Sequence, residues 1–189
     1  MPFNKIFLYM KLNLPQYSMM IATQLSRSYL LRQHLALYAL GQSIYLKKIY
    51  ICWVDNHSFP GFDHYINKSK YHVPFELIPT VTGFITDRFR IPNSLKTETL
   101  LILDDDINVE GKDLDKAFSY YISGNFSFRI FGTFTRRFYK GKYLLPRCNQ
   151  PYSIVLTGFS FLSRQLLEEY NKDKYKDLRN YCIKIRNCD

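Results

Sequence analysis

Short apolar runs rich in branched and aromatic residues recur along the chain and predict the strands of a sheet. Runs of this length, bounded by polar residues, are typical of strands that are buried on both faces. We expect strands at residues 17–23, 48–53, 73–78, 100–103, 126–134 and 152–161. Thr157 and Gly158 interrupt the last run, which indicates a tight turn or a close approach of the backbone to a ligand.

Between these runs, apolar residues recur at helical spacing. Ser26 is expected to cap a helix that extends through Tyr38 and carries leucines on one face. Further helices are expected at residues 113–121 and 163–170, the latter capped by its first residue, with a helical turn within 92–99. Strands that alternate with helices predict an α/β fold with a mainly parallel sheet, in which ligands bind at the carboxyl ends of the strands.

Three consecutive aspartates, Asp104, Asp105 and Asp106, follow directly after the predicted strand at residues 100–103. Three like charges in succession repel one another, and a divalent cation would relieve that repulsion. Hard oxygen ligands select Mg²⁺ or Mn²⁺, which most often hold substrate phosphates. The alternative is a solvated acidic turn, which is the commoner outcome for a lone Asp-x-Asp. The surrounding sequence has to decide between these two interpretations.

The size and composition of the chain suit a single globular domain, with 189 residues of which 47% are hydrophobic. A formal net charge of +10 suits polyanionic partners, such as nucleic acid, an anionic membrane or the phosphates of a nucleotide. Lysines and arginines are scattered along the chain, which favours solvated surfaces over one nucleic-acid-binding stripe. The cysteines form no Cys-x-x-Cys pair, so no structural zinc site is expected, and Cys52 is predicted to be a buried thiol.

An ordered series of motifs extends from about residue 17 to the last residue. In sequence order, the motifs are Thr23 and Arg27, Leu30-Leu31, Tyr38, the strand that ends in Trp53, Arg88-Phe89, Thr97-Glu98-Thr99, Leu103 with the three aspartates, Ala117-Phe118, Gly132, Arg136, Tyr152-Ser153, Val155-Leu156-Thr157-Gly158, Phe161 and Asn187-Cys188-Asp189. The series resembles the C-terminal glycosyltransferase domain of the exostosin and exostosin-like family, which builds heparan-sulfate-type and related glycans. One triple aspartate would be weak support, whereas the ordered set is specific.

The resemblance implies a single glycosyltransferase domain over residues 17–189, preceded by a stub at residues 1–16 and incomplete at its C-terminal end. It implies a GT-A fold, in which a nucleotide-binding α/β half is joined to an acceptor-binding half. The implied reaction is metal-dependent and retaining, with Mn²⁺ or Mg²⁺ as cofactor, and moves an N-acetylhexosamine from a UDP-sugar to a glycan or glycolipid acceptor.

The resemblance also implies a location in the Golgi or endoplasmic reticulum, where full-length relatives are held by an N-terminal membrane anchor. No stretch of this chain approaches the roughly 18 apolar residues that a membrane span needs. We therefore expect no membrane span within it.

The resemblance further implies roles for individual residues. Asp106 would bind the metal directly, with Asp104 as the second residue of the metal site, while Asp104 and Asp105 would bind the ribose and order the metal's waters. The expected nucleotide-binding residues are Thr23, Arg27, Asp87, Arg88 and the three aspartates. The expected acceptor-binding residues are Arg136, Tyr152, Thr157 and Gly158, and the expected catalytic residues are Arg136, Asn187 and Asp189. Trp53 and Phe161 are expected in the core.

The chain departs from the family pattern at two internal places. Val54 stands where the family has asparagine, and Gly83 and Asp87 stand where it often has asparagine. A carboxylate accepts hydrogen bonds but does not donate them, so one hypothesis is that Asp87 favours a guanine edge over uracil. These departures leave the nucleotide open.

The chain also departs from the family at its end. In the family the Asn-Cys-acid segment is followed by a second acid, which is usually credited with catalysis, and by a helix that closes over the donor. Because the sequence stops at Asp189, we expect this chain to be a fragment that binds nucleotide weakly and turns over poorly.

Two alternatives from other functional classes stay open. One is a non-catalytic homologue that binds a nucleotide or a glycan, and the other is a basic nucleic-acid-binding domain. Protection by UDP that requires Mn²⁺ would separate the first from the second, because a nucleic-acid-binding domain does not need the metal.

Overall fold

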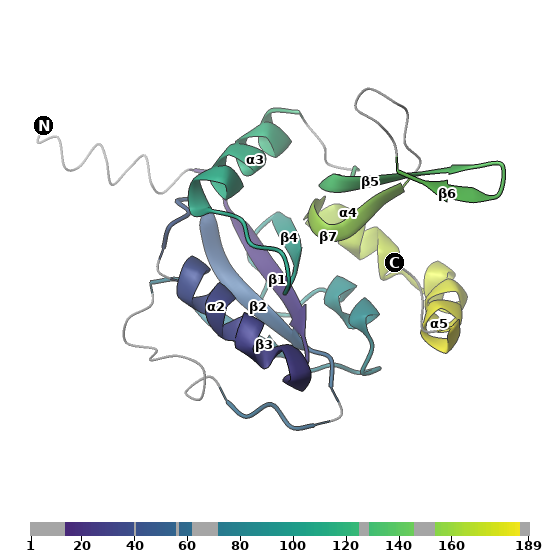
Figure 1. The fold of residues 1–189 in the computed structure, drawn as a ribbon, viewed down its shortest axis with the longest axis horizontal. Helices are drawn as coiled ribbons and strands as arrows, with labels where there is room; N and C mark the ends of the chain where they lie inside the picture. Colours follow the sequence, from purple (N-terminus) through teal and green to yellow (C-terminus); the bar gives the residue numbers. More distant parts are fainter. Residues whose placement is uncertain are drawn as a thin grey trace, which may run out of the picture.

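The fold is built on one sheet of seven strands, in the order β3-β2-β1-β4-β7-β5-β6 (Figure 1). The computed structural model describes residues 14–39, 41–55, 57–61, 72–124, 129–145 and 154–185. The strands are β1 (Tyr17–Thr23), β2 (Leu46–Trp53), β3 (Phe75–Ile78), β4 (Thr99–Asp104), β5 (Phe131–Tyr139), β6 (Lys142–Leu144) and β7 (Ile154–Ser163). The α-helices are α2 (Ser28–Tyr38), α3 (Gly111–Ser123), α4 (Arg164–Tyr170) and α5 (Lys176–Ile185), and the 3₁₀ helices are η1 (Leu25–Arg27), η4 (Ile85–Phe89) and η5 (Asp173–Tyr175).

The sheet has a parallel half and an antiparallel half. Strands β3, β2, β1 and β4 run parallel, and Ala22 near the end of β1 pairs with Cys52 of β2 on one side and with Asp104 of β4 on the other. Their carboxyl ends therefore meet at one edge. Strand β7 pairs antiparallel with β4 and continues the sheet into β5 and β6. The expected GT-A type of α/β fold with a mainly parallel sheet is confirmed, with this antiparallel extension.

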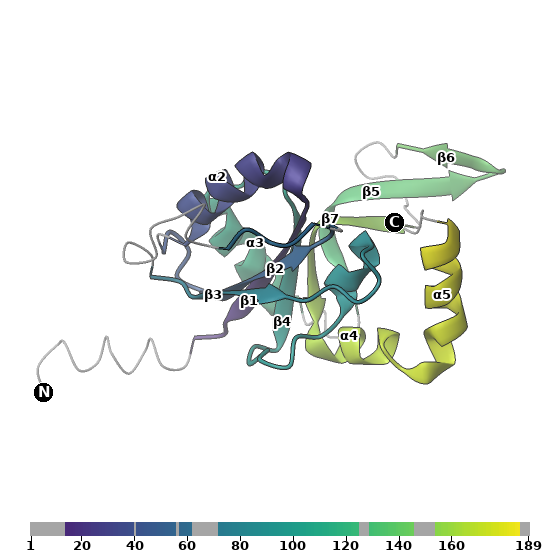
Figure 2. The same ribbon diagram turned by 90° about the horizontal axis from the view of Figure 1, so that it is seen from below.

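Helices cover both faces of the sheet (Figure 2). On one face α2 and α3 bury Leu31, Leu35 and Phe118 against alternate residues of the central strands. On the other face Leu167 of α4 and Phe89 of η4 pack against the intervening residues of the same strands. A strand covered on both faces has no polar side to present to solvent, which explains the apolar runs within β1, β2 and β4.

Several local predictions are confirmed. The first strand has its predicted bounds, and helix α4 begins at Arg164 after Ser163, whose side chain accepts a hydrogen bond from Leu166 N at 3.1 Å. Trp53 and Phe161 lie in the core. Cys52 is fully buried, and burial raises the pKa of its thiol to about 12.

Among the helices of the described ranges, none is both long and apolar enough to cross a membrane.

Two helix predictions were wrong in detail. Ser26 lies inside the 3₁₀ turn η1, and α2 begins at Ser28 without a side-chain cap. The helical turn expected within 92–99 is only a hydrogen-bonded turn, in which Leu95 N donates to Pro92 O at 2.9 Å. Proline biases the residue before it toward extended conformations, and the helical turn lies earlier, in η4.

The strand predicted at residues 126–134 was misplaced. Residues 126–128 lie outside the described residues; β5 begins at Phe131 and continues to Tyr139, five residues beyond the predicted end, so Arg136 and Arg137 lie in the strand. Polar residues are compatible with this strand because an antiparallel strand at the margin of a sheet keeps solvent contact. The chain turns instead at Lys140 and Gly141, which have φ angles of +47° and +74°.

Candidate functional site

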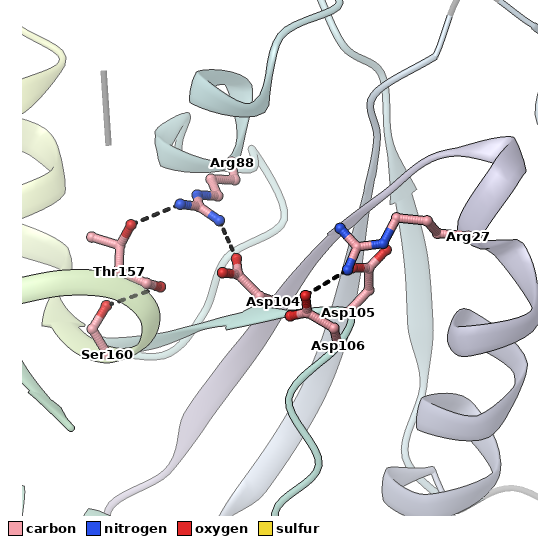
Figure 3. Close-up of polar contacts among 7 residues, drawn as sticks. All are labelled: Arg27, Arg88, Asp104, Asp105, Asp106, Thr157 and Ser160. Atoms are coloured by element: carbon pink, nitrogen blue, oxygen red, sulfur yellow. Dashed lines mark hydrogen bonds and ion pairs between the residues drawn. The ribbon is translucent and has the colours of Figure 1, made fainter. Parts of the chain in front are cut away.

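The three aspartates lie at the carboxyl edge of the parallel half (Figure 3). Asp104 is the last residue of β4, and Ile107 N donates to its carbonyl at 3.1 Å, so the chain turns directly after the strand. Asp105 is buried, whereas the side chain of Asp106 is 59% exposed. The turn therefore holds one carboxylate within the protein and presents another to solvent.

Arg27 lies in η1, shortly after β1, and neutralises Asp105 and Asp106. Its Nη2 lies 2.9 Å from Asp105 Oδ1 and 2.7 Å from Asp106 Oδ2. The side chain of Arg27 is 38% exposed. An exposed arginine exchanges partners at little cost, so this ion pair can open when a stronger anion arrives.

Arg88 lies in η4 and neutralises Asp104. Its side chain is only 3% exposed. Its Nη1 donates to Asp104 Oδ1, and its Nη2 donates to Thr157 Oγ1 at 2.7 Å. One guanidinium thus joins the end of β4 to β7 (Figure 3). A planar guanidinium suits this task because it presents donors in a fixed fork.

Gly158 explains the irregularity that the sequence indicated in β7. Gly132 of β5 pairs with Ser160, but the next pair is Phe134 with Leu156, so β7 carries extra residues at this point. A Cβ atom on Gly158 would lie 2.7 Å from Asp104 Oδ2. The predicted close backbone approach is therefore present, and what it approaches is a carboxylate of the site.

Helix α2 holds the segment after β4 at two points. His34 Nε2 lies 2.6 Å from the carbonyl oxygen of Asp105, and Val109 N donates to Tyr38 Oη at 3.1 Å. A carbonyl only accepts, so Nε2 carries the proton, and burial lowers the pKa of His34 and keeps its ring neutral. Sequence reasoning missed His34, for which the only signal was its position on the buried face of the helix.

The surroundings of Asp105 shift the pKa of its carboxyl in opposite directions. Burial raises the pKa of its carboxyl above the ordinary value, and the Thr23 hydroxyl and the charge of Arg27 oppose that effect. Thr23 itself is buried at the end of β1. The structure thus brings together Thr23, Arg27, Arg88, the three aspartates, Thr157 and Gly158, all of which the sequence had marked.

Asp87 has a different environment from the one expected. Its Oδ2 accepts hydrogen bonds from Val81 N at 3.0 Å and Thr82 N at 2.8 Å, and its Oδ1 lies 3.0 Å from Arg90 Nε. Both carboxylate oxygens are engaged within the protein, and the side chain is buried. The arrangement argues against the hypothesis that Asp87 selects a guanine edge, because the buried carboxylate is already held by two backbone N–H groups and by Arg90.

The remaining expected residues lie apart from this cluster or outside the described residues. Arg136 lies in β5 opposite Ile154, beyond the end of β4, and donates to the carbonyl of Thr135 at 2.8 Å. Tyr152, Asn187 and Asp189 lie outside the described residues. Their predicted roles stay predictions.

The acidic turn is compatible with a divalent ion completed by a ligand. Within the described residues no group of three or more histidine, cysteine or acidic side chains converges on one point. Magnesium sites that hold substrate phosphates need only one or two carboxylates, since the phosphates supply further oxygens. Asp104 and Asp106 provide hard oxygens of that type.

Comparison with known sequences places these features in a family. A profile of the glycosyl transferase family 64 domain matches residues 17–189. The Exostosin-like-3 homolog of Caenorhabditis elegans is 28% identical over 157 residues, which are 82% of this chain and 19% of that protein. Glycosyltransferase family protein 64 C3 of Arabidopsis thaliana is 30% identical over 135 residues, or 66% of this chain and 40% of that protein. Human Exostosin-2 is 26% identical over 150 residues, or 76% of this chain and 20% of that protein.

Comparison with solved structures supports the fold alone. The crystal structure of S. aureus TarS 1–349 superposes with a TM-score of 0.50 and 13% sequence identity, over 82% of this chain and 49% of that one. The chain therefore spans less than half the length of each of these relatives.

Proposed function

Because the chain belongs to glycosyltransferase family 64, we propose that it binds a nucleotide-sugar at the triple aspartate and transfers the sugar to a glycan or glycolipid acceptor. The proposed donor is UDP-linked, the sugar is an N-acetylhexosamine, and its configuration is retained. The proposed cofactor is Mn²⁺ or Mg²⁺, and the proposed location is the lumen of the Golgi or endoplasmic reticulum.

One observation carries this proposal. Two arginines and three aspartates meet at the carboxyl ends of β1 and β4, in the part of an α/β sheet where ligands bind. The site offers guanidinium groups for a diphosphate and carboxylates for a cation within a single cluster. A solvated acidic turn would need neither the buried Arg88 nor the close contact with Gly158.

The two arginines support different steps in this proposal. Arg27 is partly exposed, so it can leave Asp106 and donate to the diphosphate of the donor. Arg88 is enclosed between Asp104 and Thr157, so it orients Asp104 and stays in place. A bound metal ion would supply Lewis-acid stabilisation of the departing diphosphate.

The proposal implies that metal and nucleotide bind together. Asp106 is paired with Arg27 in the structure, so a metal ion has to compete with a guanidinium for this carboxylate. A diphosphate would draw Arg27 away and add oxygen ligands of its own. We therefore expect UDP and Mn²⁺ to stabilise the chain together far more than either does alone.

A thermal melt tests this expectation directly. At a concentration about a hundred times the dissociation constant, a ligand stabilises the native state by about 2.7 kcal/mol, which raises the Tm of a chain of this size by about 5–10 °C. Asp106→Asn should lose at least about 100-fold in UDP affinity in the presence of Mn²⁺. Asp113→Asn, an exposed acid at the start of α3, is the matched control and should bind as the original chain does.

Transfer requires a separate measurement. Release of UDP from UDP-N-acetylglucosamine and UDP-N-acetylgalactosamine, with and without a chelator, reports on turnover and metal dependence. Binding without turnover would support the non-catalytic alternative. Binding of UDP that ignores both Mn²⁺ and Asp106→Asn would overturn the proposed site.

A further inference from the structure

Strands β5 and β6 form a hairpin that extends past the end of the parallel strands. The last pair between β4 and β7 on this side is Leu103 with Phe159, whereas β7 continues to pair with β5 as far as Ile154 and Arg136. The hairpin, residues 131–145, therefore projects beyond the carboxyl edge at which the triple aspartate lies. In Figure 2 it lies at the end of the molecule opposite α2 and α3, the same end as α5.

The hairpin is strongly basic, and the sequence around it contains no acid. No aspartate or glutamate occurs between Asp115 and Glu168. The hairpin carries four cations in this interval, Arg136, Arg137, Lys140 and Lys142. Within the described residues, no ion pair joins Arg137, Lys140 or Lys142 to a carboxylate. Among the described residues, the charges of Arg137, Lys140 and Lys142 are therefore not neutralised by a carboxylate.

The same hairpin exposes large apolar side chains. Phe138 is 60% exposed and Leu145 is 73% exposed, and Tyr139 and Leu144 are also exposed. Arg137 Cζ lies 4.7 Å and Lys140 Nζ lies 5.4 Å from the centre of the Tyr139 ring, so cations and aromatic surface adjoin. Within the described residues, β5 pairs beyond Arg136 only with β6. A two-stranded segment has little stability of its own, which makes a partner surface favourable.

We propose that the hairpin docks on the surface of an anionic lipid bilayer. Its lysines and arginines would face the anionic headgroups, while Phe138, Tyr139 and Leu145 would enter the interface between headgroups and acyl chains. Aromatic rings with adjoining cations suit this interface because one end is apolar and the other polar. The surface thus complements a bilayer in both charge and polarity.

A hydrated polyanion complements the hairpin less well. A sulfated glycan or a nucleic-acid backbone would pair with the cations but would leave aliphatic Leu145 in water. Docking on a bilayer would also turn the edge that carries the triple aspartate toward the lipid surface. This inference concerns the antiparallel half and holds whether or not the chain transfers sugars.

Sedimentation with vesicles tests the proposal. The chain should bind vesicles of phosphatidylcholine with phosphatidylserine and should bind phosphatidylcholine alone much more weakly. Lys140→Glu with Lys142→Glu should weaken binding by at least about twentyfold, since each cation near such a surface contributes about fivefold. Phe138→Ser with Leu145→Ser should also weaken binding, while the thermal melt with UDP and Mn²⁺ stays unchanged.

Two pairs of substitutions on α3 serve as controls. Lys112→Glu with Lys116→Glu repeats the change of charge, and Tyr120→Ser with Ile122→Ser repeats the loss of exposed apolar surface. Both should leave vesicle binding within about twofold of the original. Equal loss in the α3 variants, no binding to either vesicle, or binding to soluble dextran sulfate that depends on the two lysines but not on Phe138 and Leu145 would overturn the proposal.

Discussion

The two halves of the sheet differ in what covers them. The parallel half lies between helices on both faces, and its strands β1, β2 and β4 are buried along nearly their whole length. The antiparallel half is covered only near Phe161, and β5 is half-buried or exposed at every residue. The candidate site lies at the seam between them, with its aspartates from β4 and its glycine from β7.

The two halves therefore contribute to the candidate site in different ways. Burial on both faces fixes the turn after β4 within a rigid frame, which suits a site that has to hold charges at short range. The exposed half meets solvent, and it contributes to the site only where β7 passes β4. Substitutions at the seam should therefore affect both stability and nucleotide binding, whereas substitutions on either side should affect mainly one of them.

The largest effect is expected from Arg88→Met, which removes the link across the seam. Asp104 and Thr157 would lose their shared donor, and we expect a loss of about 2–3 kcal/mol in the free energy of unfolding. UDP affinity in the presence of Mn²⁺ should also fall, because Asp104 would no longer be oriented. Urea denaturation and titration calorimetry measure the two quantities.

Arg27→Met is the comparison for Arg88→Met. Arg27 is partly exposed, although its partner Asp105 is buried, so its loss should cost about 1–2 kcal/mol in stability, less than the loss of Arg88, while still weakening UDP binding. Equal losses of stability in the two variants would show that the buried link is no stronger than the ion pairs of the partly exposed Arg27.

A smaller effect is expected from Gly158→Ala, which crowds the seam without removing a charge. The new methyl group would meet Asp104 Oδ2, the end of a side chain that can move, so we expect a stability loss of only about 1 kcal/mol. The displaced carboxylate should lower UDP affinity about tenfold.

Gly132→Ala provides the opposite pattern. Its Cβ atom would meet Val155 Cγ1 at 2.7 Å and Phe159 O at 2.8 Å, and a backbone atom yields less readily than a side chain. We expect a stability loss of about 1–3 kcal/mol with UDP affinity unchanged. If the two glycine variants lost stability and affinity in the same proportion, the contact with Asp104 would have no special role.

Inside the parallel half, the comparison is made by His34→Leu. The carbonyl of Asp105 would lose its buried partner, at a cost of about 1–2 kcal/mol. The turn would loosen, and UDP affinity should fall severalfold. His34→Gln, which keeps a donor on the same face of α2, should recover part of the affinity; recovery by a second apolar variant such as His34→Met would instead indicate that the residue acts by filling space.

The parallel half was largely predictable from the sequence. Continuous apolar runs mark strands buried on both faces, and the spacing of Leu31 and Leu35 marks the buried face of α2. The exposed half was predicted less well, because β5 mixes polar and aromatic residues on both faces and its turn at Lys140 and Gly141 resembles a basic loop. The strand predictions succeeded where the strands are buried on both faces, and failed for β5, which stays in contact with solvent.

The candidate site was predictable only in part. The triple aspartate is visible as a local motif, and Arg88 was found through the family resemblance. His34 was missed because a single histidine on an apolar helix face looks like any other core histidine. The environment of Asp87 could not be predicted, because its donors are the backbone N–H groups of Val81 and Thr82, and the sequence does not indicate where backbone groups point.

The contact between Gly158 and Asp104 also constrains how such chains can diverge. The two positions share one small volume, although β7 and β4 are far apart in the sequence. A relative with any larger residue at the position of Gly158 would need a shorter or displaced side chain opposite it. Among relatives the two positions should therefore change together, and a lone exchange at either one should mark a lineage in which the candidate site has been rebuilt or lost.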